Sequence, residues 1–186
     1  MDNKAQFISA AIHDCQATIR ATDVKVGALL AALFLPFTHI VSLWDSLERI
    51  ATFFDSHVFT VLFFVVWFVA IYTLITTISA IDNPAKHIDN DADCQGSFYG
   101  SDLYRFRLFD AFHLKPNGRA TQTVSTFSST FPVTDEDICN ELTFEHMKLI
   151  YIRDIKLHRL NLSLRLSTAW FVISAIAFLT VRISCA

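Results

Sequence analysis

Three uncharged apolar stretches dominate the hydrophobic pattern of the chain. Val26 to Trp44 holds 19 residues without a charge, and Val58 to Ile81 holds 24. Leu166 to Val181 is shorter, but Arg165 and Arg182 at its ends have long side chains that can reach the membrane surface. A helix needs about 20 apolar residues to cross a bilayer. The pattern therefore predicts an all-α integral membrane protein with three transmembrane helices.

The remaining segments are assigned relative to these spans. We expect a cytoplasmic amphipathic helix at 1–25, transmembrane helices at 26–44, 58–81 and 166–182, an outer loop at 45–57, a cytoplasmic lobe at 82–133 and a helical stalk at 134–165. Lysine and arginine are concentrated on one side of the spans. The positive-inside rule then places the N-terminus and residues 82–165 in the cytoplasm.

Proline and hydroxyl residues suggest where helices break and begin. Pro36 should kink the first span, because proline lacks the backbone N–H that a helix uses. The Ser/Thr-rich segment 121–130 predicts a flexible connector. Thr134, followed by three acidic residues, has the features of a helix start. No glycine or proline follows, so one helix of roughly 70 Å could run from about 134 to 181.

The stalk carries an apolar seam with a seven-residue repeat. Its residues are Phe144, Tyr151, Ile155, Leu162 and Leu166. Spacings of this kind are typical of a coiled coil, and polar Lys148 and His158 at the intermediate positions could fix its register. Two interpretations remain open: the seam packs against the N-terminal helix of the same chain, or it joins copies of the chain into a homo-oligomer.

Charge and composition favour few kinds of chemistry. The net charge of −3 gives no basic field for a nucleic-acid polymer. The four cysteines are far apart, and Asp89-x-Asp91-x-Asp93 lacks the glycine and glutamate of a calcium loop. No arrangement of catalytic residues is recognisable. We therefore predict a protein that is not an enzyme and that needs no metal or cofactor.

Asp23 and Lys25 lie where the first span enters the membrane. Snorkelling explains the lysine, but an acid gains nothing from it. Asp23 is therefore expected to form a tie to a stalk cation such as Arg159 or Arg165.

A second candidate site lies in the cytoplasmic lobe. Its residues are Phe98, Tyr99, Tyr104, Arg105 and Arg107. Guanidinium groups bind phosphate and aromatic faces stack on bases, so these residues could bind a nucleotide. The same aromatics could equally form the core of the lobe.

Several of these segments together resemble the Pycsar transmembrane effectors. The likeness is carried by Asp23-x-Lys25 with Gly27, the Asn83–Pro84 exit, Ser97 to Gly100, and the basic helix from Glu141 to Arg159. The family often has arginine soon after the proline, where this chain has Lys86, and residues 113–131 match nothing in it.

The resemblance implies a specific function. Such effectors act beside a nucleotide cyclase that makes cyclic UMP or cyclic CMP during phage infection. The effector binds this messenger and impairs the bacterial inner membrane, so that the cell dies before phage are released. Two alternatives stay open from the residues themselves: a small ion channel or transporter subunit, and a membrane anchor for a soluble partner.

Overall fold

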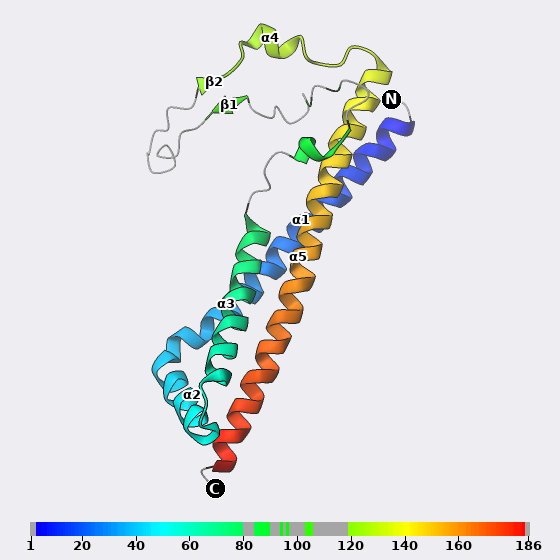
Figure 1. Ribbon diagram of the computed structural model, residues 1–186. Helices are drawn as coiled ribbons and strands as arrows, with labels where there is room; N and C mark the ends of the chain where they lie inside the picture. Colours follow the sequence, from blue (N-terminus) through cyan, green and yellow to red (C-terminus); the bar gives the residue numbers. More distant parts are fainter. Residues whose placement is uncertain are drawn as a thin grey trace. The chain divides into compact units, whose positions relative to one another are not determined.

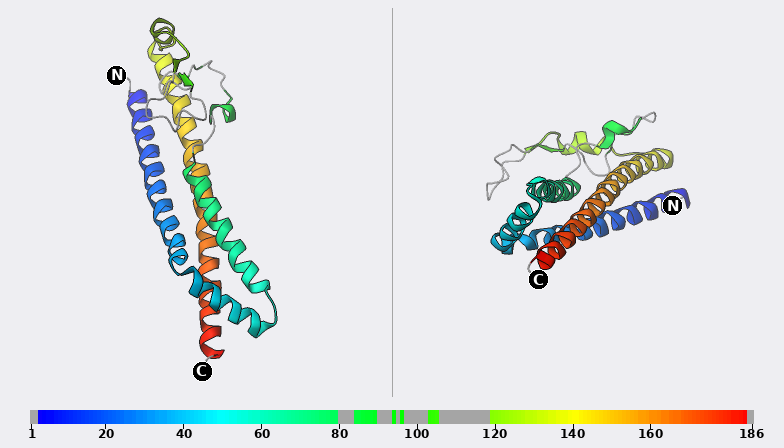
Figure 2. Two further views of the ribbon diagram at one scale, coloured as in Figure 1. Left: turned by 90° about the vertical axis from the view of Figure 1, so that its left-hand side faces the viewer. Right: turned by 60° about the horizontal axis from the view of Figure 1, so that its bottom comes forward.

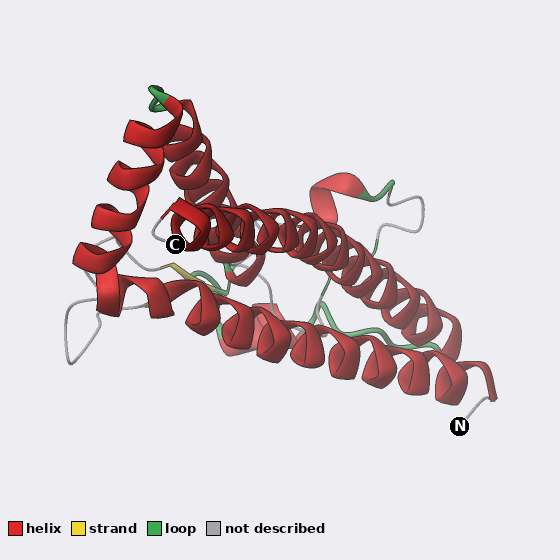
Figure 3. Cartoon of the chain, turned by 90° about the horizontal axis from the view of Figure 1, so that it is seen from below, coloured by secondary structure: helices red, strands yellow, loops and turns green. Residues whose placement is uncertain are grey.

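The computed structural model describes residues 3–79, 84–89, 94, 96, 103–105 and 119–184, and helices make up nearly all of this part (Figure 3). The helices are α1 (Asn3–Phe34), α2 (Ile40–Phe54), α3 (Val58–Ile78), α4 (Val124–Ser128) and α5 (Asp135–Ser184). Two 3-10 turns, η1 (Leu35–His39) and η2 (Pro84–His87), and a pair of two-residue antiparallel strands, β1 (Tyr104–Arg105) and β2 (Arg119–Ala120), complete the described elements. The predicted all-α class is confirmed.

Three helical segments are long and apolar enough to cross a membrane, as in a multi-pass membrane protein. They are Asn3–Phe54, Val58–Ile78 and Asp135–Thr180. Each covers all or nearly all of one of the three apolar stretches of the sequence. The third belongs to the 50-residue helix α5, which continues the predicted stalk without interruption.

The first apolar stretch is broken at Pro36, as predicted. Helix α1 ends at Phe34, and η1 separates it from α2. The predicted outer loop at 45–57 is wrong for most of its length, because α2 continues to Phe54. Its charged residues suggested a loop, but Leu47 and Ile50 are buried on the opposite face of an amphipathic helix.

Two helix boundaries follow from side-chain caps. Thr134 Oγ1 accepts the N–H of Asp137, whose carboxylate accepts the N–H of Thr134 in return, at 3.1 and 3.2 Å. This reciprocal pair is a capping box, and it explains why α5 begins where the sequence predicted. The predicted flexible connector at 121–130 instead contains α4, whose first turn is capped by the Thr123 hydroxyl.

The chain divides into two compact units. Residues 1–16 and 83–151 form unit 1, and residues 17–82 and 152–186 form unit 2, so α1 and α5 each contribute to both. In unit 2, α3 and α5 run antiparallel side by side, with α1 beside them (Figures 1 and 2). Their register is set by a contact between the hydroxyls of Ser163 and Thr73, which are 2.9 Å apart.

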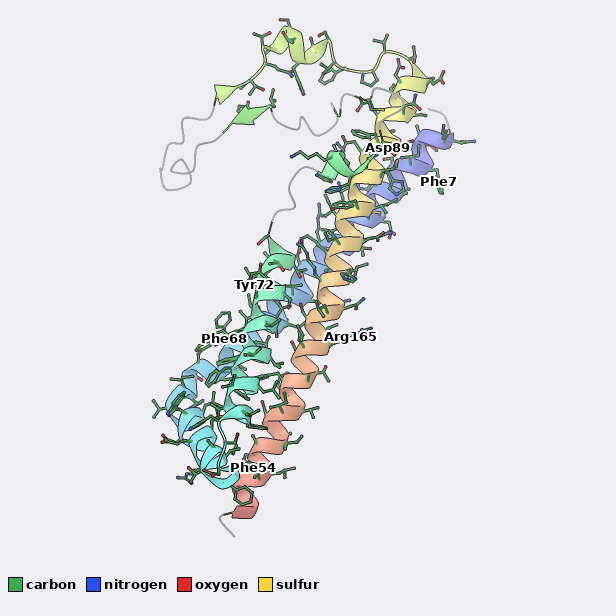
Figure 4. The ribbon with its side chains drawn as sticks, in the orientation of Figure 1. Phe7, Phe54, Phe68, Tyr72, Asp89 and Arg165 are labelled. Atoms are coloured by element: carbon green, nitrogen blue, oxygen red, sulfur yellow. The ribbon has the colours of Figure 1, made fainter. Side chains whose placement is uncertain are left out.

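The core of unit 2 is apolar and rich in aromatic residues. Its largest fully buried side chains are Trp67, Phe63, Leu33, Ile50 and Leu74. On the outside, Phe68 and Tyr72 of α3 and Arg165 of α5 point away from the neighbouring helix (Figure 4). Large apolar side chains on the outer surface are what a lipid environment favours.

Candidate functional site

An ion pair joins α1 to α5 in unit 2. Lys156 Nζ donates to Asp23 Oδ1, although the two residues are 133 positions apart in the sequence. The lysine side chain is 9% exposed and the aspartate side chain 41% exposed. The lysine is therefore largely withdrawn from water and depends on the carboxylate for its charge partner.

Asp23 pairs with a stalk cation, as predicted, but the cation is Lys156 rather than either of the two named as examples, Arg159 and Arg165. Arg165 is exposed on the outer face of α5, and Arg159 is used elsewhere. Lys156 lies one turn earlier than Arg159 on the same face, which the sequence alone does not distinguish. Lys25, the other residue of the membrane-entry motif, is exposed.

Arg159 caps the C-terminal end of α3. Its Nη1 donates to the backbone carbonyl of Thr76 at 2.6 Å. Thr76 belongs to the last turn of α3, where carbonyls have no partner within the helix and the helix dipole is negative. A cation at this position satisfies one carbonyl and stabilises the dipole. Asp23, Lys156, Arg159 and the Thr76 carbonyl together form what we call the entrance layer.

Beyond the entrance layer, hydroxyl groups continue along the same face of α5. Ser163 is fully buried, and its Oγ lies 2.9 Å from Thr73 Oγ1 and 2.8 Å from the Arg159 carbonyl. Ser167 and Trp170 follow one and two turns later, both buried. Among the described residues, neither Ser167 Oγ nor Trp170 Nε1 has a hydrogen-bond partner. This face was not predicted, although the spacing of its polar residues by three and four is present in the sequence.

Unit 1 contains a second ion pair, which is buried and lies within α5. Lys148 donates to Glu145, whose side chain is 1% exposed. Burial raises the pKa of Glu145, and the hydrogen bond and charge of Lys148 oppose this rise. Lys148 Nζ also lies 4.7 Å from the centre of the Phe144 ring, which is a favourable cation–π distance.

The predicted stalk seam is only partly buried. Phe144 is buried, Tyr151 and Ile155 are half-buried, and Leu162 is 44% exposed. Phe144 and Leu162 are 18 residues apart, which is five turns, so both lie on the same side of a straight helix. Leu162 is exposed because the side of α5 that is buried at this level is the one that carries Leu160 and Ser163. Whether the seam joins copies of the chain stays a prediction.

Only part of the predicted nucleotide site lies among the described residues. Tyr104 is exposed on β1, opposite Ala120 of β2. Phe98, Tyr99, Arg107 and the side chain of Arg105 lie outside the described part. The nucleotide site therefore stays a prediction.

One aromatic stack and one exposed acid are visible elsewhere in unit 1. His87 stacks on Tyr151, with ring centres 4.7 Å apart and planes 14° apart. Asp89 is exposed, and it is labelled in Figure 4. The described residues contain no group of three or more side chains suited to hold a metal ion.

Comparison with known proteins does not assign the chain to a family. No protein-family model, curated protein or solved structure matches it. The resemblance to Pycsar effectors therefore rests on the motifs of the sequence alone.

Proposed function

We propose that this chain is a bacterial inner-membrane effector of antiphage defence that responds to cyclic UMP or cyclic CMP. One observation carries the proposal. The Lys156–Asp23 ion pair brings together two of the motifs on which the resemblance rests, the membrane-entry motif and the basic helix. Residues so distant in sequence have no local reason to complement each other, and a functional tie between them supports the proposal.

The proposed mechanism is a shift between two arrangements of α5. A ligand changes such an equilibrium only if it binds one arrangement better than the other. Because α5 is one continuous helix, a displacement of its first half is carried into its apolar second half. The Asp23–Lys156 ion pair holds the resting arrangement, and its separation would release α5. Homo-oligomerisation through the exposed part of the stalk seam would follow this release.

The two other functions predict different behaviour. A constitutive channel or transporter subunit would change membrane potential without any messenger. A membrane anchor would leave the potential unchanged and would require a soluble partner. Co-expression with a pyrimidine nucleotide cyclase separates all three.

The test compares cells that express the full chain with an active or a catalytically inactive cyclase. We expect a potential-sensitive dye to report depolarisation only with the active enzyme. Depolarisation with the inactive cyclase would favour the channel, and no depolarisation in either case would favour the anchor. Calorimetric titration of the purified full chain with cyclic UMP and cyclic CMP identifies the messenger, with cyclic AMP as the control.

A further inference from the structure

One face of α5 carries polar groups from the entrance layer into the apolar part of unit 2. Its residues are Lys156, Arg159, Ser163, Ser167 and Trp170. Spacings of three and four place them on one side of a helix. At 1.5 Å per residue, this face is about 21 Å long, compared with a hydrocarbon thickness of about 30 Å. The polar face is therefore long enough to cross most of the bilayer, but not all of it.

Aromatic rings close the deep end of this face. The rings of Trp67 and Trp170 stack with centres 5.7 Å apart and planes 16° apart. Phe63 lies 5.3 Å from Trp170, and Phe37 stacks on Trp67 at 4.5 Å. Trp67 and Phe63 are almost completely buried. These stacked rings fill the interior beside Trp170, and the next hydroxyl on this side of α5, that of Ser174, donates to the Trp170 carbonyl.

Two buried polar atoms at this end of the face have no hydrogen-bond partner among the residues that the structure describes. Ser167 and Trp170 are 3% and 4% exposed, and neither Ser167 Oγ nor Trp170 Nε1 makes a hydrogen bond within the described part of the chain. The pair lies at i and i+3 of one helix, so both groups face the same interior region. A buried polar atom is normally satisfied by protein or by water, and a water needs about two to four polar partners. The indole N–H of Trp170 can donate a hydrogen bond to such a water, and the hydroxyl of Ser167 can either donate one or accept one.

Packing between helices explains Ser163 but does not explain Ser167. Ser163 has a partner on α3, the hydroxyl of Thr73, as expected for interhelical hydrogen bonding in a membrane. The register of the two helices places Ser167 close to the level of Ala70, which is fully buried and has no side-chain polar group. The Ser167 hydroxyl faces the methyl group of Ala70 and gains no hydrogen bond there. Alanine at position 167 would make the same contact between the helices.

We propose that Ser167 and Trp170 bind a buried water at the deep end of a proton path along α5, and that the stacked Trp67–Trp170 pair closes it. This inference rests on the proposed function, because it identifies the proton as the species whose leak impairs the membrane. Hydroxyls and water relay a proton by accepting one on one side and releasing another on the opposite side, so no group is changed. Larger ions would need charged or carbonyl groups to replace their hydration shell, and the deep half of this face has hydroxyls instead.

The Trp67–Trp170 stack, which we call the gate, is tested with the purified full chain in lipid vesicles that contain a pH-sensitive dye. An imposed pH difference drives protons, and valinomycin with potassium removes the opposing potential. Trp170→Ala removes the stack and should give a several-fold faster pH change than the unsubstituted chain. Phe178→Ala is the matched control, because it removes an exposed aromatic ring from the same helix. Equal rates in the two variants would overturn the gate.

The path is tested by adding a second substitution to the leaking variant. Ser167→Val replaces the hydroxyl with a methyl group and adds a second methyl group, and it should return the leak to the rate of the unsubstituted chain. Thr168→Val likewise exchanges a hydroxyl for a methyl group, at an exposed neighbouring position, and should leave the leak unchanged. A leak that survives Ser167→Val would overturn the path. If Trp170→Ala does not purify as a monodisperse protein, Trp170→Leu replaces it, since leucine keeps apolar volume and loses the stack.

The two proposals fail in different ways. The vesicle measurements contain no nucleotide, so a leak in Trp170→Ala that Ser167→Val blocks supports the path even if the unsubstituted chain ignores cyclic nucleotides. Conversely, nucleotide-dependent depolarisation that persists in Ser167→Val would support the proposed function and refute this path.

Discussion

The indole N–H of Trp67 donates to the backbone carbonyl of Leu33 at 2.9 Å. Leu33 lies three residues before Pro36, at the point where α1 gives way to the 3-10 turn η1. In a 3-10 turn this carbonyl would accept the N–H of residue 36, which proline lacks. Trp67 therefore supplies from α3 the donor that Pro36 removes from the first span.

This relationship predicts a non-additive effect on stability. Trp67→Phe keeps an aromatic ring but leaves the Leu33 carbonyl without the donor, which should cost about 1–3 kcal/mol. In a Pro36→Ala background the backbone can supply its own N–H, so the same substitution should cost less. Thermal unfolding in detergent of the four proteins of this cycle gives the coupling energy. Trp44→Phe is the control, because Trp44 is exposed. Equal costs of Trp67→Phe in both backgrounds would contradict the explanation.

The sequence predicted the helices better than their contacts. Apolar run length, Pro36 and Thr134 each act locally, and they predicted the three apolar helices, the break and the start of α5 correctly. Helix α2 was missed because its charged residues were counted without their amphipathic spacing.

The contacts depend on which side of each helix faces its neighbour and on how far along the helix each contact lies. A single sequence specifies neither. One turn separates Lys156 from the expected partner Arg159, and Leu162 is exposed because the side of α5 that is buried at that level carries Leu160 and Ser163 instead. The unpartnered atoms of Ser167 and Trp170 are a property of three-dimensional packing and have no sequence signal.

The entrance layer predicts a rescue by charge exchange. Asp23→Ala leaves Lys156 largely buried without its carboxylate, and loss of a hydrogen bond to a charged group should destabilise the protein by roughly 1.5–3 kcal/mol. We expect this variant to insert but to lose its resting arrangement and its messenger-dependent toxicity. Asp23→Lys combined with Lys156→Asp restores an ion pair and should recover much of both. Lys25→Ala, at an exposed neighbouring cation, is the control. Toxicity unaffected by Asp23→Ala at matched expression would assign the ion pair to structure alone.

Glu145 predicts a dependence of unit 1 on pH. Burial raises its pKa above the ordinary value of 4.5, so the folded form holds a proton more tightly than the unfolded form. The contribution of this group is therefore fully present below pH 4.5 and is lost as pH rises through the folded pKa. As the pH rises from 4.5 through the folded pKa of Glu145, we expect amide hydrogen exchange around residue 145, corrected for intrinsic rates, to become faster. Glu145→Gln removes the ionisable group and should abolish this dependence; an unchanged profile would exclude Glu145 as its source.

The final prediction concerns the side of the membrane on which each terminus lies. In unit 2, Asp23 near the start of the first apolar stretch pairs with Lys156 before the third, while Leu33 and Trp170 both lie near Trp67 deeper in the core. The first and third spans therefore run parallel, and the positive-inside rule places their shared starting side in the cytoplasm. A reporter that is active only in the cytoplasm should work when inserted near residue 118 and fail when fused after residue 186. An enzyme that is active only outside the inner membrane should give the opposite result at the same two positions. Activity of the cytoplasmic reporter at the C-terminal fusion would show either an inverted protein or an even number of spans, and the insertion near residue 118 distinguishes these two cases.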